Sequence, residues 1–258
     1  MRMFDLTGKV ALVTGGNGGI GLGMAEGLAR GGAGIAIWGG NPDKNEAAGA
    51  KLRKHGGRVL VQRCDVSRED EVEERMAELL AEFGRLDGCF ANAGRSLERT
   101  AFHELTAEAW RGVMDVNLDG TFFTLRAASR HMVARAKAGD PGGRLVATSS
   151  TSTVHGPAGA VAYGASKGAL NVMMRALAVE YARYGITANA IVPGWIETEM
   201  TAGKIADERF SGNVLPRIPH RRWGTGDDFA GIAAYLMSEA SRYHTGDSFV
   251  IDGAYTIF

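Results

Sequence analysis

The sequence has little of what metal centres, disulfide scaffolds and nucleic-acid-binding proteins require. Its 258 residues include only two cysteines, and the six histidines stand singly, so no pair has the close spacing of a metal site. The 29 basic and 29 acidic residues cancel, which leaves no overall field to attract nucleic acid or an anionic membrane. No apolar run is long enough to cross a bilayer or to form a signal peptide. We expect a cytoplasmic protein without a metal, whose partners are small molecules and copies of itself.

The chain also lacks a visible linker, and its apolar segments are evenly spread, so we expect a single domain over residues 1–258. Short runs rich in Val, Ile, Leu and Ala alternate with longer helical patterns, which is typical of repeated βαβ units. The sequence therefore predicts an α/β, Rossmann-like fold with one doubly wound parallel sheet of about seven strands and helices on both faces. The expected strands are Val10–Thr14, Ile35–Trp38, Val59–Gln62, Asp87–Ala91, Arg144–Thr148, Thr187–Ile191 and Ser248–Ile251. The expected helices are Gly21–Arg30, Asp43–Lys54, Ser67–Phe83, Ala107–Ala134, Ala160–Tyr184 and Asp227–Ser238.

Local patterns sharpen this prediction at two helix starts and at the cysteines. The segments Ser67–Asp70 and Thr225–Asp228 each place a hydroxyl three residues before a carboxylate, which predicts a capping box. With strands ordered 3-2-1-4-5, the third and fourth strands, which carry Cys64 and Cys89, are three positions or roughly 14 Å apart, so we expect no disulfide.

A glycine-rich segment, Thr14–Gly21, follows the first expected strand and opens the first expected helix. Glycines at this place let the backbone turn tightly and approach a pyrophosphate held by the helix N-terminus, with Gly15, Gly19 and Gly21 as anchors. An ordinary turn is the alternative, because the chain contains 37 glycines and the spacing is wider than the usual dinucleotide-binding pattern.

Tyr163 and Lys167 are four residues apart in a helical pattern and therefore share one face. A nearby ammonium, together with the charge of an oxidised nicotinamide, would lower the pKa of the phenol from about 10, which suits proton exchange near neutral pH. A solvated helix face would show the same spacing. Ser150, at the end of the fifth expected strand and thirteen residues before Tyr163, favours the chemical interpretation.

Four of the first five expected strands end in polar or glycine-bearing segments, at the sheet edge where ligands bind in such folds. These segments are the glycine loop, Asp65–Val66, Ala91–Gly94 and Ser149–Ser150. Packing alone explains this coincidence poorly, so the sequence predicts a ligand site at the carboxyl edge.

From Gly8 to about Tyr255 the sequence closely resembles the short-chain dehydrogenase/reductase family. The motifs that carry the resemblance are Thr14-Gly-x-x-x-Gly-Ile-Gly21, Asp65-Val66, Asn92-Ala-Gly94, Asn117, Ser150, Tyr163-x-x-x-Lys167, and Pro193-Gly194 followed by Thr198. The resemblance implies that Tyr163 is the general acid/base, that Ser150 binds substrate oxygen, and that Lys167 holds the nicotinamide ribose. It further implies that Asn117 holds a water that extends the proton path. Two departures stand out: Ala91 replaces the first of two asparagines, and the second strand ends without a cofactor-selecting charge.

The resemblance also implies a set of cofactor contacts and an NAD(P)-dependent transfer of a hydride to or from a secondary alcohol. The expected cofactor-binding residues are Gly15, Asn17, Gly19, Ile20, Gly21, Gly39, Asp65, Val66, Asn92, Ala93, Gly94, Tyr163, Lys167, Pro193, Gly194, Ile196 and Thr198. We expect a cyclic or sugar-like substrate, bound by Ser150, His155, Tyr163 and Trp195. The alternatives are a 3-oxoacyl thioester reductase, for which Arg217, Arg221 and Arg222 could dock an acyl carrier, and a catalytically silent dinucleotide sensor.

The cofactor prediction depends on the end of the second strand, Trp38–Asn41. A 2′-phosphate normally requires Arg or Lys, and a free ribose diol is usually held by Asp or Glu, but this segment offers neither. Lys44 begins a helix and can point into solvent, whereas the amides of Gly39 and Gly40 could cradle an anion. We expect NAD to be preferred, with NADP as the alternative, because desolvating an unpaired phosphate is costly.

Two further predictions concern mobility and assembly. The segment 198–223 has scattered apolar residues without strong caps, and we expect a lid over the bound substrate. The helix Ala160–Tyr184 has more apolar residues than one core-facing stripe needs, and the tail Tyr255–Phe258 ends in large apolar groups. The family resemblance implies a homotetramer with interfaces at these two places.

Overall fold

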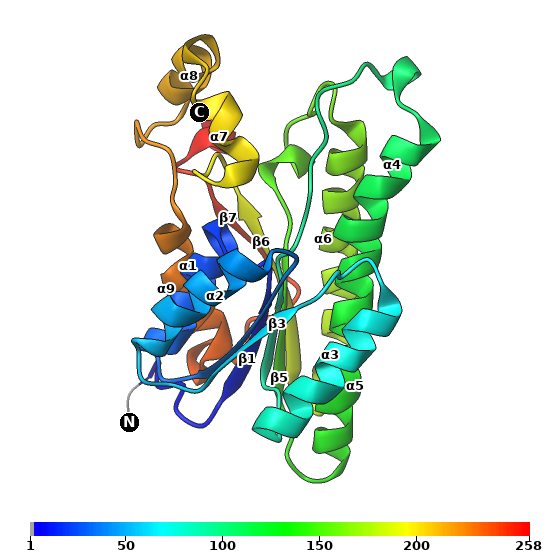
Figure 1. Cartoon of the computed structure of the whole chain (residues 1–258), viewed down its shortest axis with the longest axis vertical. Coiled ribbons are helices and arrows are strands. Elements are labelled where there is room, and N and C mark those ends of the chain that lie inside the picture. The colour runs from blue at the N-terminus through cyan, green and yellow to red at the C-terminus, as the bar shows by residue number, and fades with distance from the viewer. Residues whose placement is uncertain (1–2) are drawn as a thin grey trace.

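A computed structural model describes residues 3–258 of the chain. Seven parallel strands form one sheet in the order β3-β2-β1-β4-β5-β6-β7, so the predicted doubly wound fold is confirmed (Figure 1). The chain reverses direction across the sheet between β1 and β4, because β2 and β3 lie on one side of β1 and the later strands lie on the other. The strands are β1 Val10–Thr14, β2 Gly34–Gly39, β3 Val59–Arg63, β4 Gly88–Ala91, β5 Gly143–Thr148, β6 Ile186–Pro193 and β7 Ser248–Ile251.

Helices cover both faces of the sheet. Figure 1 shows α1, α2 and α9 on one face and α3, α4, α5 and α6 on the other, while α7 and α8 stand beside the C-terminus at one end. The helices are α1 Gly19–Arg30, α2 Pro42–Arg53, α3 Glu69–Phe83, α4 Ala107–Met114, α5 Gly120–Lys137, α6 Val161–Tyr181, α7 Glu199–Ile205, α8 Glu208–Val214 and α9 Ala230–Met237. No helix within residues 3–258 is long and apolar enough to span a membrane.

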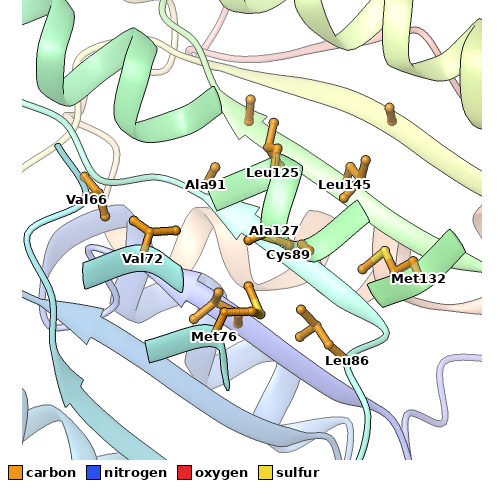
Figure 2. Packing of buried hydrophobic residues seen from close by; sticks show 14 of the residues in the cluster. Val66, Val72, Met76, Leu86, Cys89, Ala91, Leu125, Ala127, Met132 and Leu145 are labelled. Atoms are coloured by element: carbon orange, nitrogen blue, oxygen red, sulfur yellow. The ribbon is translucent and has the colours of Figure 1, made fainter. Parts of the chain in front are cut away.

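Two hydrophobic cores sandwich the sheet because successive strand residues point to opposite faces. Figure 2 shows Met76 of α3, Cys89 of β4 and Leu145 of β5 converging in the core under α3 and α5. Phe90, the next residue of β4, belongs to the second core, under α1 and α9. Cys64 and Cys89 are both buried and unpaired, as predicted. Burial raises the pKa of the Cys89 thiol to about 12, which keeps it protonated at neutral pH.

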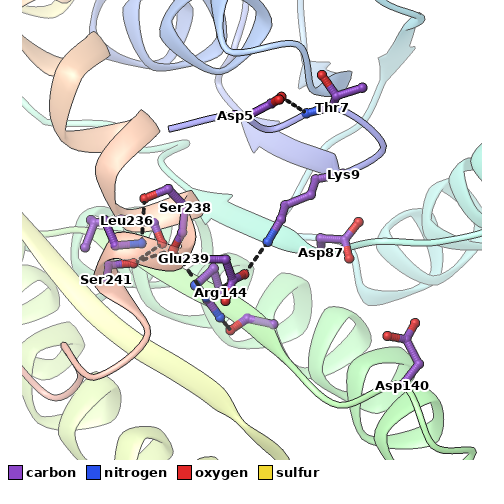
Figure 3. Close-up of polar contacts among 12 residues, drawn as sticks. Asp5, Thr7, Lys9, Asp87, Asp140, Arg144, Leu236, Ser238, Glu239 and Ser241 are labelled. Atoms are coloured by element: carbon purple, nitrogen blue, oxygen red, sulfur yellow. Dashed lines mark hydrogen bonds and ion pairs between the residues drawn. The ribbon is translucent and has the colours of Figure 1, made fainter. Parts of the chain in front are cut away.

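The amino edge of the sheet is closed by charged side chains. Lys9 and Arg144 both reach Glu239, at 2.6 and 3.5 Å, after α9 (Figure 3). Asp87 accepts hydrogen bonds from the amide of Val10 and from Arg85, at 2.9 and 2.8 Å. Burial alone would raise the pKa of Asp87, but these bonds outweigh it and hold the pKa below its usual range. This edge is therefore consolidated by ion pairs, and the opposite, carboxyl edge carries the pockets described below.

The structure confirms one local helix prediction and corrects two others. The capping box at Thr225 and Asp228 is confirmed, although a 3-10 turn, Gly226–Phe229, precedes α9. The box predicted at Ser67 is wrong: helix α3 begins at Glu69, and the Ser67 hydroxyl donates to Asp65 Oδ1 at 2.7 Å. The single helix predicted over Ala107–Ala134 is interrupted, because Asp115–Asp119 forms a π-helical turn between α4 and α5.

Candidate active site

Two pockets meet at the carboxyl edge of the sheet. The first, of about 490 Å³, lies along the glycine loop and the ends of β4, β5 and β6, and we call it the cofactor pocket. The second, of about 370 Å³, lies between the loop after β5 and α7, and we call it the substrate pocket. Five residues line both pockets: Ser150, Tyr163, Gly194, Met200 and Thr201. A reaction between two ligands would therefore take place beside the Ser150 and Tyr163 hydroxyls.

The glycine loop fits an anionic dinucleotide. Gly15 and Gly19 adopt φ values of 63° and 49°, in the left-handed region that favours glycine. A Cβ on Gly21 would overlap the carbonyl oxygen of Gly15, so Gly21 is needed for packing the loop. Helix α1 begins after Gly18 without a side-chain cap or an acidic residue in its first turn. Its first amide groups thus remain available to a phosphate at the helix N-terminus.

Most of the predicted cofactor residues line the cofactor pocket. Those that do are Gly15, Asn17, Gly19, Ile20, Asn92, Ala93, Gly94, Tyr163, Lys167, Pro193, Gly194, Ile196 and Thr198. Those that do not are Gly21, Gly39, Asp65 and Val66. The pocket also contains residues that were not among the expected cofactor-binding residues: Gly18, Gly40, Asn41, Lys44, Thr148, Ser149, Glu199, Met200 and Thr201. Several of these directly adjoin predicted residues, whereas only the tertiary fold brings the start of α2 and the start of α7 to one pocket.

The end of β2 is shaped by a hydrogen bond between two asparagines. Asn17 Nδ2 donates to Asn45 Oδ1 at 2.8 Å, and Asn45 Nδ2 donates to the carbonyl of Gly39 at 2.9 Å. A Cβ on Gly39 would lie 2.7 Å from Asn17 Cγ, so glycine allows the loop to approach the strand. Lys44 forms an ion pair with Glu199 of α7 instead of pointing freely into solvent. Among residues 3–258, Lys44 is the cation that lines this part of the cofactor pocket, and it is thus already paired with a carboxylate.

Lys167 lies on the inner face of α6 and is almost completely buried. Its Nζ donates to the carbonyl of Thr148 at 2.7 Å and lies 5.8 Å from the centre of the Tyr163 ring. Burial lowers the pKa of the Lys167 ammonium to about 8, because the charged form loses hydration. The predicted placement of the phenol and the ammonium on one helix face is therefore confirmed.

Tyr163 has a pKa raised by burial, and a hydrogen bond with Ser150 opposes part of that effect. This direction is opposite to the one expected for the working enzyme. The reason is that burial removes hydration from the phenolate, and this effect exceeds that of the Ser150 hydrogen bond. Ser150 also accepts a bond from the amide of Ser152 at 3.1 Å, which fixes the loop after β5.

Asn117 sits in the π-helical turn and is fully buried. Its Oδ1 accepts from the amide of Arg95 at 2.8 Å, and its Nδ2 donates to the Arg95 carbonyl at 3.0 Å and to Ser166 Oγ at 3.1 Å. These bonds tie the loop after β4 to α6. Asn117 Oδ1 and Lys167 Nζ both lie within 3.4 Å of the place where a Cβ on Gly94 would stand. A side chain at Gly94 would therefore crowd both groups.

All four predicted substrate residues, Ser150, His155, Tyr163 and Trp195, line the substrate pocket. The His155 ring meets Tyr255 edge-on at 5.4 Å, and Trp195 meets Phe210 of α8 edge-on at 5.0 Å. Sequence reasoning missed Arg99, Ser152 and Lys204 in this pocket. The spacing of Met200 and Lys204, one helical turn apart, could have indicated Lys204, but Arg99 gave no such signal.

The expected lid segment, 198–223, contains two short helices with defined caps, which corrects the expectation that strong caps are absent. Thr198 and Thr201 form a capping box at α7, and Asp207 accepts from the amide of Phe210 at the start of α8.

The three arginines considered for docking an acyl carrier all have contacts within the chain. Arg217 stacks over the ring of Tyr255, Arg221 donates to the carbonyl of Pro216, and Arg222 pairs with Asp228.

Comparison with known proteins adds an independent line of support. A sequence profile described as Enoyl-(Acyl carrier protein) reductase matches residues 15–256. The chain belongs to the short-chain dehydrogenase/reductase family.

Relatives cover this family member almost from end to end. Gluconate 5-dehydrogenase of Gluconobacter oxydans (strain 621H) is 32% identical over 255 residues, which span 99% of this chain and 97% of that protein. Sorbose reductase of Schizosaccharomyces pombe is 34% identical over 257 residues, which span 98% of each. The crystal structure of a gluconate 5-dehydrogenase from Burkholderia cenocepacia J2315 in complex with NADP and tartrate superposes with a TM-score of 0.91. It is 34% identical and covers 98% of this chain and 97% of that one.

These relatives are dehydrogenases and reductases matched along their full length. The chain is therefore an NAD(P)-dependent oxidoreductase that transfers a hydride between a nicotinamide cofactor and a secondary alcohol or its ketone.

Proposed function

We propose that Ser150, Tyr163 and Lys167 carry out the proton chemistry of a dehydrogenase acting on sugar-like secondary alcohols. The observation that supports this most directly is that Ser150 and Tyr163 line both the cofactor pocket and the substrate pocket. A group at that junction can contact the reacting oxygen while the reacting carbon faces the cofactor.

The proposed roles follow from the positions of the side chains. The nicotinamide supplies the hydride acceptor or donor. In oxidation, the Tyr163 phenolate accepts the hydroxyl proton of the substrate, and in reduction the phenol returns it. Ser150 donates a hydrogen bond to the same substrate oxygen. Lys167, buried beside Tyr163, stabilises the phenolate by its charge and holds the ribose of the cofactor. Asn117 would act by holding the loop after β4 and a water on the proton path.

A sugar-like substrate is supported by the relatives and by the pocket. The relatives described above are named for gluconate and sorbose, which are polyhydroxylated. A substrate pocket of about 370 Å³ is at the small end of the range for ligand sites, which suits a compact molecule. Ser152, Thr151 and His155 offer it several polar groups.

We further infer that NAD is the preferred cofactor. Gly40 and Asn41 stand at the end of β2 where a phosphate-binding cation would be needed, and Lys44 is matched by Glu199. A 2′-phosphate would have to compete with Glu199 for that cation, whereas a ribose diol would not. The Burkholderia relative binds NADP, so this inference concerns features of the present chain. A kcat/KM for NADP more than tenfold above that for NAD would overturn it.

The segment 198–223 is proposed to close over the bound ligands. Met200, Thr201 and Lys204 of α7 line the substrate pocket, so movement of α7 would open or close it. Hydrogen exchange in this segment should slow when cofactor and a substrate analogue are both bound, and unchanged exchange would contradict the lid.

The decisive test of the proposed function is Tyr163→Phe, which removes the proton donor and keeps the ring. Turnover should fall by about 10²–10⁴-fold, as is usual for loss of a general acid/base, while the Kd for the cofactor stays within about threefold. Steady-state kinetics with sugar-like alcohols and cofactor fluorescence titration measure the two quantities. A variant that retains more than about a tenth of wild-type kcat would exclude this role for Tyr163.

A further inference from the structure

The substrate pocket contains two cationic side chains that no acidic side chain accompanies. Arg99, in the loop after β4, and Lys204, in the last turn of α7, both line it. Burial lowers the pKa of Lys204, and the positive charge of Arg99 lowers it further, so the two groups act on each other. Within the described part of the chain, neither has a carboxylate as an ion-pair partner. Two neighbouring cations repel, and a bound anion would remove that repulsion.

Two polar atoms of the same pocket also lack partners. Ser152 Oγ and His155 Nε2 are buried from solvent and form no hydrogen bond with any residue of the described chain. Buried polar atoms in native proteins are nearly always hydrogen-bonded. Two unpartnered polar atoms in one pocket therefore indicate that a ligand supplies the missing hydrogen bonds. A hydroxyl group suits both, because it can donate as well as accept.

We propose that the substrate pocket binds a hydroxylated carboxylic acid, with its carboxylate between Arg99 and Lys204 and its hydroxyl groups on Ser152 and His155. This rests on the proposed function, because the same pocket holds Ser150 and Tyr163. The relatives are named for both an acid, gluconate, and a neutral sugar, sorbose. The cationic pair favours the acid. Charge-assisted hydrogen bonds to a carboxylate are roughly twice as strong as neutral ones, whereas a neutral sugar would leave both cations without a carboxylate partner.

The experiment compares six-carbon sugar acids with the polyols that differ from them only at carbon 1, such as D-gluconate and D-glucitol. With NAD and with NADP, kcat/KM should be at least tenfold higher for the acids than for the polyols. Lys204→Met and Arg99→Gln should each reduce this acid-to-polyol ratio at least tenfold, mainly through KM. Lys51→Met, which removes a cation on the exposed face of α2 outside both pockets, is the matched control and should keep the wild-type ratio.

Tartrate binding to the cofactor-loaded enzyme, measured by calorimetry, separates this inference from the proposed function. At least tenfold weaker binding in Lys204→Met and Arg99→Gln, but not in Lys51→Met, supports the carboxylate site even if no alcohol is turned over. In that case it is the proposed function that fails. Conversely, turnover of sugar-like alcohols with an unchanged acid-to-polyol ratio and unchanged tartrate affinity in both variants would overturn the carboxylate site alone.

Discussion

At the scale of single residues, the site contains one charged group, Lys167, that is almost completely buried. Lys167 is buried between α6 and β5, with its ammonium bonded to one backbone carbonyl, at 2.7 Å. No carboxylate contributes to its altered pKa, which burial alone lowers. Burial therefore destabilises the charged form in the folded protein, although a pKa of about 8 leaves most of the ammonium protonated at neutral pH, as the proposed chemistry needs. A residue of this kind lowers the stability of the folded protein while it supplies a reactive group to the site.

The pH dependence of stability tests the destabilising effect of the buried Lys167 charge. The pKa of Lys167 is about 8 in the folded protein and 10.5 in the unfolded chain, so its charge disfavours folding below pH 8, and the penalty fades as pH rises toward 10.5. The free energy of unfolding of the wild type, relative to Lys167→Met, should therefore increase by about 2 kcal/mol between pH 7 and pH 9.5. Urea denaturation at both pH values measures it. Lys51→Met, on the exposed face of α2, should show no such trend, and a flat difference for Lys167→Met would contradict the buried charge.

We expect the residue at position 40 to determine whether NAD or NADP is preferred. A Cβ on Gly40 would meet no atom within 4 Å, and Gly40 does not need a positive φ, so a larger side chain fits without strain. Gly40→Arg should raise the ratio of kcat/KM for NADP over NAD at least tenfold, since a guanidinium can bind the 2′-phosphate through two hydrogen bonds. Gly40→Ala is the matched control, because it adds a Cβ without a charge. Equal ratios in the two variants would mean that the 2′-phosphate does not reach this position.

At the scale of elements, the contact between α1 and the segment leading into α9 depends on missing side chains. A Cβ on Gly27 of α1 would lie 2.6 Å from the Ala230 Cα, and one on Gly23 would overlap the carbonyl of Gly226. The two backbones therefore approach closely, which fixes α1 and with it the glycine loop at its start. This close approach explains why Gly23 and Gly27 stand within a helix, although glycine has a low intrinsic helix propensity.

Gly27→Ala tests this contact directly. In an open helix the change would stabilise the protein by up to about 1 kcal/mol, but here it should destabilise it by about 1–3 kcal/mol through overpacking. Gly231→Ala, on α9 itself with no atom within 4 Å of the new Cβ, is the control and should be neutral or stabilising. Thermal unfolding of both variants provides the comparison, and two similar Tm shifts would show that the helices do not need this close approach.

At the scale of the whole molecule, two of the exposed apolar areas lie on α6 and at the C-terminus. On α6, Val172 and Val179 are 66% and 83% exposed, while Leu170 and Met174 on the opposite face are buried in the core. At the C-terminus, Ile257 and Phe258 are 87% and 71% exposed. Isolated exposed apolar residues are common, but a second apolar face on one long helix is typical of an interface. These two areas are the ones at which a homotetramer is predicted.

We expect light scattering at micromolar concentration to give the mass of a tetramer for the wild type. Val179→Asp should reduce that mass, because a carboxylate buried between two copies of α6 would lose hydration without gaining a partner. Phe4→Asp, which replaces a half-exposed apolar residue away from both areas, should leave the mass unchanged. A monomeric wild type would contradict the predicted assembly.

The sequence by itself determined the order of the seven strands along the chain and the groups that bring chemistry to the site. Alternating apolar runs specify a parallel sheet, because strands buried on both faces must be apolar throughout. The spacing of Tyr163 and Lys167 specifies a shared helix face, and both sequence and structure place Ser150 just after β5. These features are local, so periodicity and turn chemistry reveal them.

The tertiary structure alone decided which distant segments meet. Lys44 and Glu199 are 155 residues apart, and their ion pair appears only when α2 and α7 stand at one end of the sheet. Arg99 and Lys204 converge on one pocket for the same reason, and the π-helical turn at Asn117 has no helical-period signal of its own. Non-local contacts of this kind depend on the packing of whole elements, which no window of sequence contains.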